Sequence, residues 1–254
     1  MHEIVTLQFG EYANYVGNHF WNIQQAYPSE EGEVAEPQVG ARQAPNHTLL
    51  YRESETRGYG RTFTPRLLIY DLKENLGSLS SYSGISASST QPPTDFQTQT
   101  HHEETWDQPA QLCAQEMIQS APFIKRWESP DPDAPVHQPL EPDTHYWTDF
   151  SENFFHPRTF SPHFSTLAVN GGLNGFAEFQ QGRDLFRYQL TQGELNEDNL
   201  RFFVEESDYL QGFQIIANAN DGFAGYTAAY VEYLRDEFPK EPVLVFGAAH
   251  VAEA

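Results

Sequence analysis

The strongest constraint on this fold is a strand-like run that leads through glycine into a helix-like run, near both ends of the chain. Residues 3–9 read as a short strand, Gly10 follows, and a helical pattern with spacings of three and four comes next. That pattern consists of Tyr12, Tyr15, Val16, His19, Phe20 and Ile23. Further on, residues 213–217 read as a strand, 220–225 as a glycine turn and 223–238 as a helix that Pro239 stops. Alternating strands and helices predict an α/β fold with a mostly parallel sheet.

A third strand is predicted where an apolar run ends in an acidic residue. Residues 67–70 are continuously apolar, as in a buried parallel strand, and Asp71 follows them. We expect Asp71 at the carboxyl edge of the sheet, where α/β folds place ligands. Glycine turns that open a helix can hold a phosphate at that edge. The alternative is that these glycine turns are structural and hold no ligand.

Charge and cysteine content exclude several classes of protein. Asp and Glu total 36 against 14 Lys and Arg, so the formal net charge is −22. Without a basic surplus, we expect neither direct binding to nucleic acid nor adsorption to anionic lipid. The single cysteine, Cys113, excludes an internal disulfide and a cysteine-cluster zinc site. No apolar run approaches the ~20 residues that span a bilayer, so we expect no transmembrane segment.

Residues 79–145 break the α/β pattern. They begin in a serine-rich stretch and contain more than half of the 17 prolines of the chain. This composition predicts a largely disordered, acidic insertion. His101, His102, Glu103 and Glu104 could suggest a metal cluster, but adjacent ligands in such a segment favour a solvated loop.

Five segments of the chain, in order, are similar to tubulin. They are residues 3–17 at the tubulin opening, 64–72 at the V-P-R-A-I-L-V-D-L strand, 155–160 at F-R-P-D-N-F, 210–214 at L-Q-G-F-Q and 235–239 at I-R-E-E-Y-P. Residues 12–17 with 21–24, and 208–214 with 221–223, resemble the Misato family rather than true tubulins. The chain therefore resembles the Misato family of the tubulin/FtsZ superfamily.

This resemblance implies a tubulin/FtsZ-like, Rossmann-type GTPase domain built from residues 1–78 and 146–247. The insertion 79–145 would interrupt that domain, and residues 248–254 would form a tail. Misato-like proteins are about twice this long, so we expect that the C-terminal half of the family is missing here.

The resemblance also locates a candidate site for GTP with Mg²⁺. The implied residues are Gly10, Glu11, Asn14, Asp71, Asn220, Asp221, Gly222, Phe223, Ala224 and Gly225. The loops depart from tubulin, whose G-G-G-T-G-S-G signature is replaced by residues 220–226. Phe223 replaces the threonine hydroxyl, and Asp221 and Glu11 add negative charge that would repel phosphate. Mg²⁺ bridged by Glu11, Asp71 or Asp221 would offset that repulsion. No catalytic residue and no separate metal site is assigned.

Three functions remain open from the sequence. The resemblance implies a non-enzymatic factor for mitochondrial distribution, morphology and inheritance of mitochondrial DNA. Such a factor would act in the cytoplasm and at the outer mitochondrial surface, with protein partners there or in the cytoskeleton. The alternative within the superfamily is a polymerising GTPase. A third reading is an unrelated α/β enzyme that uses Asp71, Asp221 and His19, although His19 is expected to be a packed core residue.

Overall fold

The computed structural model describes residues 2–30, 46–56, 60–72, 74–77, 144–153, 155–161, 176–193, 195 and 197–249. The predicted insertion lies outside these ranges except for residues 144 and 145, and so do Cys113 and the histidines at 101 and 102. The tail is described only at residues 248 and 249. The predicted boundaries of the insertion and the tail therefore stay predictions.

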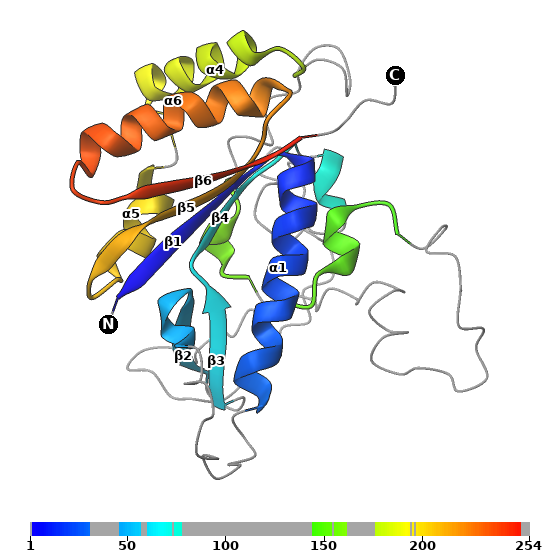
Figure 1. The fold of residues 1–254 in the computed structure, drawn as a ribbon, viewed down its shortest axis with the longest axis vertical. Helices are drawn as coiled ribbons and strands as arrows, with labels where there is room; N and C mark the ends of the chain where they lie inside the picture. Colours follow the sequence, from blue (N-terminus) through cyan, green and yellow to red (C-terminus); the bar gives the residue numbers. More distant parts are fainter. Residues whose placement is uncertain are drawn as a thin grey trace, which may run out of the picture.

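A parallel four-stranded sheet forms the centre of the fold (Figure 1). Its strands are β1 (Glu3–Phe9), β4 (Leu67–Tyr70), β5 (Leu210–Asn218) and β6 (Val243–Ala248). Their order in the sheet is β4-β1-β5-β6, and every neighbouring pair is parallel. The predicted α/β fold with a parallel sheet is confirmed, and all four strands end at the same edge.

Helices cover both faces of this sheet. One face packs against α5 (Glu197–Glu205) and α6 (Gly222–Glu237), and α4 (Phe179–Gln192) packs along α6 (Figure 1). The helix predicted at residues 223–238 is confirmed as α6, and its Phe223, Tyr226, Tyr230 and Leu234 are all buried in this core. The other face carries α1 (Glu11–Glu30) and a smaller core that includes Trp21, Tyr51 and Trp147.

Short elements complete the α1 side of the sheet. A hairpin is formed by β2 (Tyr51–Thr56) and β3 (Gly60–Pro65), which pair antiparallel after the 3-10 turn η1 (His47–Leu49). Two further 3-10 turns follow the predicted insertion, η3 (Trp147–Phe150) and η4 (Pro157–Thr159). Phe160 then forms a bridge to Ile69, so this aromatic segment covers the outer edge of β4.

The predicted apolar face of α1 is only partly buried. Tyr15 and Phe20 pack against the smaller core, but Tyr12, Val16, His19 and Ile23 are exposed. The most buried residues of the helix are instead Ala13, Asn14, Gly17, Asn18 and Trp21. His19 is therefore not a packed core histidine. The cause is the sheet face beneath the helix, where β1 presents the buried polar side chains of Thr6 and Gln8. A Cβ at Gly17 would collide with the Gln8 side chain, so glycine allows α1 to lie close to this polar surface.

Candidate functional site

The predicted site residues lie at the carboxyl edge of the sheet, where β1, β4 and β5 end. Gly10 follows β1 with φ +92°, and its N–H donates to the Tyr70 carbonyl at the end of β4 (3.0 Å). A Cβ at Gly10 would lie 2.5 Å from the Asn218 amide nitrogen and 2.9 Å from the Phe223 ring. Glycine is thus required both by the left-handed backbone and by the neighbouring side chains. The structure brings the three predicted loops together.

Asn218 links the loop after β5 to the first turn of α1. The N–H of Ala13 donates to Asn218 Oδ1 (2.9 Å), and Asn218 Nδ2 donates to Asp221 Oδ2 (2.6 Å). Sequence reasoning missed Asn218. The available signal was a polar side chain directly after the apolar run of β5, at the edge where ligand or loop contacts form.

Asp71 is surrounded by hydrogen-bond donors. Asn14 Nδ2 (2.7 Å) and Trp147 Nε1 (2.9 Å) donate to its Oδ2. The Leu72 N–H (2.7 Å) and Asn75 Nδ2 (2.8 Å) donate to its Oδ1. A carboxylate has about four acceptor positions, so the protein itself fills those of Asp71. The donors come from α1, from the turn after β4 and from η3.

Burial works against the charge on Asp71. The side chain is 3% exposed, and this desolvation raises its pKa to about 7, although all four hydrogen bonds act in the opposite direction. The arrangement joins segments that are far apart in the sequence, and it leaves the carboxylate without a free acceptor position for a metal ion. Asn75 and Trp147 were not predicted as site residues. The signal available for Trp147 was the aromatic sequence around it, with Tyr146 and Phe150, which is typical of an ordered segment.

Asp221 caps the N-terminus of α6. Its Oδ1 accepts the N–H of Phe223 (2.9 Å), and its carbonyl accepts the N–H of Ala224 (3.1 Å). The N–H of Gly222 donates to the Phe176 carbonyl (2.9 Å). Desolvation raises the pKa of Asp221, and its hydrogen bonds lower it. The N–H groups of Gly222, Phe223 and Ala224, at the helix end where a phosphate would bind, therefore already have acceptors within the chain.

Aromatic rings and close helix packing occupy the glycine turn. The Phe176 and Phe223 rings meet edge to face, with their centroids 5.0 Å apart. A Cβ at Gly222 would lie 2.7 Å from the Phe176 ring. A Cβ at Gly225 would collide with the Phe179 carbonyl at the start of α4. Both glycines are needed for this packing, so each has a structural role in the turn.

The remaining predicted residues are less enclosed. Glu11 lies half-buried in the first turn of α1, where desolvation raises its pKa. Asn220 is exposed in the loop after β5. Within the described ranges, no group of three His, Cys, Asp or Glu side chains is placed to share a metal ion. No helix in the part of the chain that the structure describes is long and apolar enough to cross a membrane.

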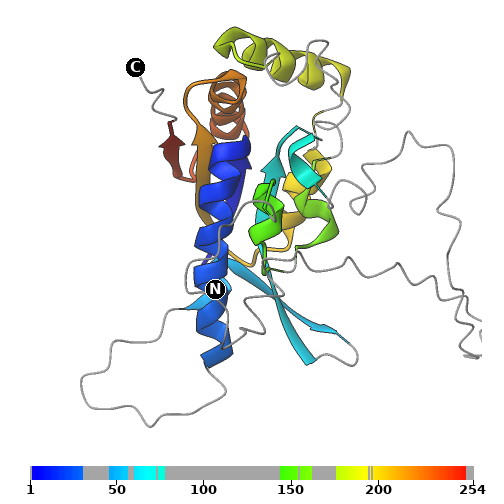
Figure 2. The ribbon, with the colours of Figure 1, turned by 90° about the vertical axis from the view of Figure 1, so that its right-hand side faces the viewer.

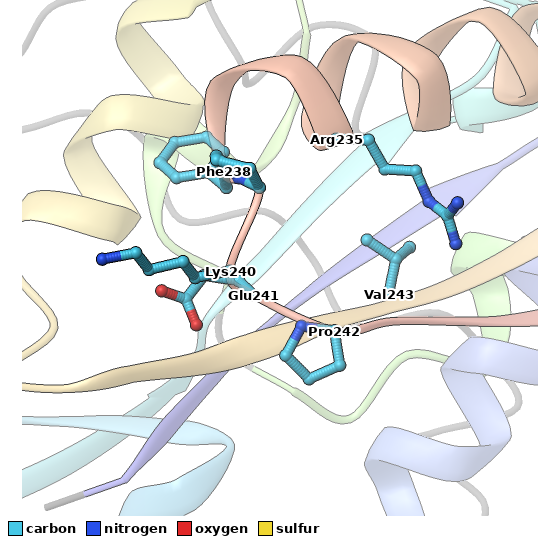
Figure 3. A pocket seen from close by; sticks show the side chains of 7 residues that line it. Arg235, Phe238, Lys240, Glu241, Pro242 and Val243 are labelled. Carbon is cyan, nitrogen blue, oxygen red and sulfur yellow. The ribbon is translucent and has the colours of Figure 1, made fainter.

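A surface hollow of about 300 Å³ lies away from this edge (Figure 3). It is formed by the turn between α6 and β6, with Arg235, Phe238 and Val243 among its lining residues. Because this turn precedes β6, the hollow lies at the amino end of that strand. It does not belong to the candidate site.

Comparison with known proteins agrees with this fold. A family model described as a tubulin domain matches residues 137–253, which include β5, α6 and β6. A second model, described as the Misato segment II tubulin-like domain, matches residues 2–129. The fold and the loops at its carboxyl edge thus define a tubulin-like protein.

Individual relatives narrow this class. Protein DML1 of Phaeosphaeria nodorum is 33% identical over 97% of this chain and 44% of its own length. Protein dml-1 of Neurospora crassa is 32% identical over 98% of this chain and 43% of its own length. Protein misato homolog 1 of Homo sapiens is 32% identical over 96% and 45%, respectively. The chain belongs to the Misato family of tubulin-like proteins, and it spans a little less than half the length of these relatives.

Proposed function

We propose that this chain is the tubulin-like part of a non-enzymatic factor for mitochondrial distribution, morphology and inheritance of mitochondrial DNA. The factor acts in the cytoplasm and at the outer mitochondrial surface, through protein partners there or in the cytoskeleton. Membership of the Misato family supports the cellular role. The observation that supports a non-enzymatic role is that Asp221 caps α6 at the position where the superfamily binds phosphate.

Charge opposes a phosphate at this position. A phosphate group near the N-terminus of α6 would lie close to the Asp221 carboxylate, whose oxygens already bind Asn218 and the Phe223 N–H. Two negative charges about 4 Å apart repel by about 4 kcal/mol at an effective dielectric constant of about 20. The Phe176 and Phe223 rings also offer no hydrogen bonds to phosphate oxygens. These features therefore support a protein that keeps the tubulin-like loops but does not bind a nucleotide in them.

The second candidate is the GTP-binding, polymerising protein. It is favoured by the meeting of all the predicted loops at one edge of the sheet. Mg²⁺ would have to relieve the charge of Asp221, but Mg²⁺ needs free oxygen ligands in near-octahedral geometry. Asp71 offers none while its four donors are in place.

Equilibrium binding of a fluorescent GTP analogue, with and without Mg²⁺, separates the two candidates. We expect no binding that unlabelled GTP can displace, from protein whose cooperative unfolding shows that it is folded. A matched double variant, Asp221→Ser with Phe223→Thr, restores a neutral cap and a hydroxyl and should bind more strongly than the wild type. Micromolar, Mg²⁺-dependent binding to the wild type would support the polymerising GTPase instead.

The cellular role needs its own experiment. Depletion of the full-length protein in its source cells should cluster the mitochondria and reduce the transmission of mitochondrial DNA. Re-expression of the wild type should restore both. Unchanged mitochondria after verified depletion would contradict the proposed role, whatever the outcome of the nucleotide experiment.

A further inference from the structure

Residues 146–153, which include η3, lie along α1 without joining either sheet. Figure 2 shows this segment, in green, beside α1. No strand of the two described sheets comes from it. Its backbone closes its own turns, because the Asp149 N–H donates to the Tyr146 carbonyl (3.0 Å) and the Ser151 N–H donates to the Thr148 carbonyl (3.1 Å). We call residues 146–153 the strap.

Two asparagines of α1 hold the strap through its backbone. Asn18 Nδ2 donates to the Trp147 carbonyl (3.0 Å), and Asn22 Nδ2 donates to the Phe150 carbonyl (2.6 Å). Asn22 Oδ1 also accepts a hydrogen bond from the Asn153 amide (2.8 Å). The two asparagines are about one helical turn apart, so their side chains lie on the same side of α1. That side of the helix therefore binds the strap along most of its length.

The contact between the strap and α1 is polar and only partly satisfied. Four of its buried side-chain atoms have no hydrogen-bond partner within the chain, namely Asn18 Oδ1, Thr148 Oγ1, Ser151 Oγ and Asn153 Oδ1. A buried polar contact is strong only when all of its members are satisfied. On the other face of the sheet, α6 is held instead by a contiguous apolar core. The strap should therefore detach at a lower free energy than α6.

The strap covers Asp71 at the carboxyl edge of the sheet. Trp147 is 1% exposed, and its Nε1 donates to Asp71 Oδ2 (2.9 Å), which also accepts from Asn14 Nδ2 (2.7 Å). The strap packs on the turn after β4 as well, because a Cβ at Gly77 would lie 2.7 Å from the Tyr146 ring. When the strap lifts, Asp71 Oδ2 loses the Trp147 donor and regains an acceptor position.

We propose that the strap opens as a unit while the sheet stays folded, and that this opening controls access to the Asp71 carboxylate. In the closed form, four donors occupy the acceptor positions of Asp71. In the open form, Asp71 accepts a hydrogen bond from a ligand that carries an N–H or O–H group. The amides of Asn18 and Asn22, released from the strap carbonyls, then provide donors on α1. This inference does not depend on the proposed mitochondrial role or on nucleotide binding.

Thiol labelling of two buried threonine positions tests the opening. In a Cys113→Ser background of the whole chain, Thr148→Cys reports on the strap and Thr227→Cys reports on α6. The pair is matched, because the native side chains are 8% and 5% exposed and neither hydroxyl has a hydrogen-bond partner. We expect a maleimide to label Thr148→Cys about 100-fold faster than Thr227→Cys, since only the strap opens without global unfolding. Equal rates would overturn the proposal.

Asn22→Ala should open the strap selectively. It removes the hydrogen bonds to the Phe150 carbonyl, the Glu152 N–H and the Asn153 amide. Labelling of Thr148→Cys should become about tenfold faster, and labelling of Thr227→Cys should not change. The control Asn199→Ala removes an amide hydrogen bond to a carbonyl outside the strap and should change neither rate. If Asn22→Ala accelerates both thiols equally, or neither, the strap does not open by itself.

Carboxyl footprinting tests the access to Asp71 and needs no cysteine variant. The whole chain is treated with a carbodiimide and glycine ethyl ester, and labelled acids are located by mass spectrometry. Labelling of Asp71 should be slow in the wild type and in Asn199→Ala, and about tenfold faster in Asn22→Ala. Equal labelling of Asp71 in these three chains would show that the strap does not control access to this carboxylate.

Discussion

Asp71 and Asp221 follow the two strands that flank β1, and they use their carboxylates in different ways. Asp71 accepts hydrogen bonds from Asn14 and Trp147, which are 57 and 76 residues away, as well as from Leu72 and Asn75. Asp221 accepts side-chain and backbone hydrogen bonds from Asn218 and Phe223, which are three and two residues away. Asp71 thus connects distant segments of the fold, whereas Asp221 caps the N-terminus of a single helix. The cost of removing each should differ accordingly.

The largest effect is expected for Asp71→Ala. This change leaves the buried amide groups of Asn14 and Asn75 and the indole N–H of Trp147 without their acceptor. Each unsatisfied buried donor costs about 1–3 kcal/mol, so we expect a loss of about 4 kcal/mol or a failure to fold. Urea unfolding followed by fluorescence measures the loss. A cost below about 1 kcal/mol would show that Asp71 does not connect these segments.

Trp147→Phe should have the next largest effect. It removes one of the four donors to Asp71 and leaves a gap in the smaller core, where Trp147 is fully buried. We expect a loss of about 2 kcal/mol from the cavity and the missing hydrogen bond. Relative to the wild type, the rate of hydrogen exchange should increase more in residues 146–153 than in β5. Uniformly faster exchange throughout the sheet would indicate global destabilisation rather than release of this segment.

The pH dependence of stability should also come mainly from Asp71. Its pKa is raised to about 7 in the folded state, so the native chain binds a proton more tightly than the unfolded chain does. The stabilisation from this proton is complete below the unfolded pKa of about 4 and is lost as the pH rises to about 7. The free energy of unfolding should therefore fall between these values. Asp71→Asn should flatten this fall, and an unchanged slope would assign it to other groups such as Asp221 and Glu11, whose pKa values are also raised.

The difference between the two acids was only partly predictable from the sequence. Both strand ends were predicted from local patterns, an apolar run that ends in Asp71 and a strand-like run that leads into the glycine turn at 220–225. The Asp71 network was not, because Trp147 lies beyond residues 79–145 and only the folded chain brings it close. The buried face of α1 was predicted only in part for a similar reason. The spacing of the apolar residues correctly predicted a helix. It could not predict that the sheet surface beneath α1 contains the polar side chain of Gln8, and therefore which face of the helix is buried.

The smallest effects are expected at Asp221, and they separate capping from charge. Asp221→Ala removes the side-chain acceptor for the Phe223 N–H, and loss of an N-cap costs about 1 kcal/mol. Asp221→Asn keeps an oxygen acceptor and removes the negative charge, so its free energy of unfolding should stay within about 0.5 kcal/mol of the wild type. Urea unfolding of both variants at pH 7 measures these values. If Asp221→Asn costs as much as Asp221→Ala, the charge itself holds Asn218 in place, and Asp221 then acts across elements as Asp71 does. If Asp221→Asn is neutral, the charge has no role in stability, and its effect would be confined to the repulsion of anions at the N-terminus of α6.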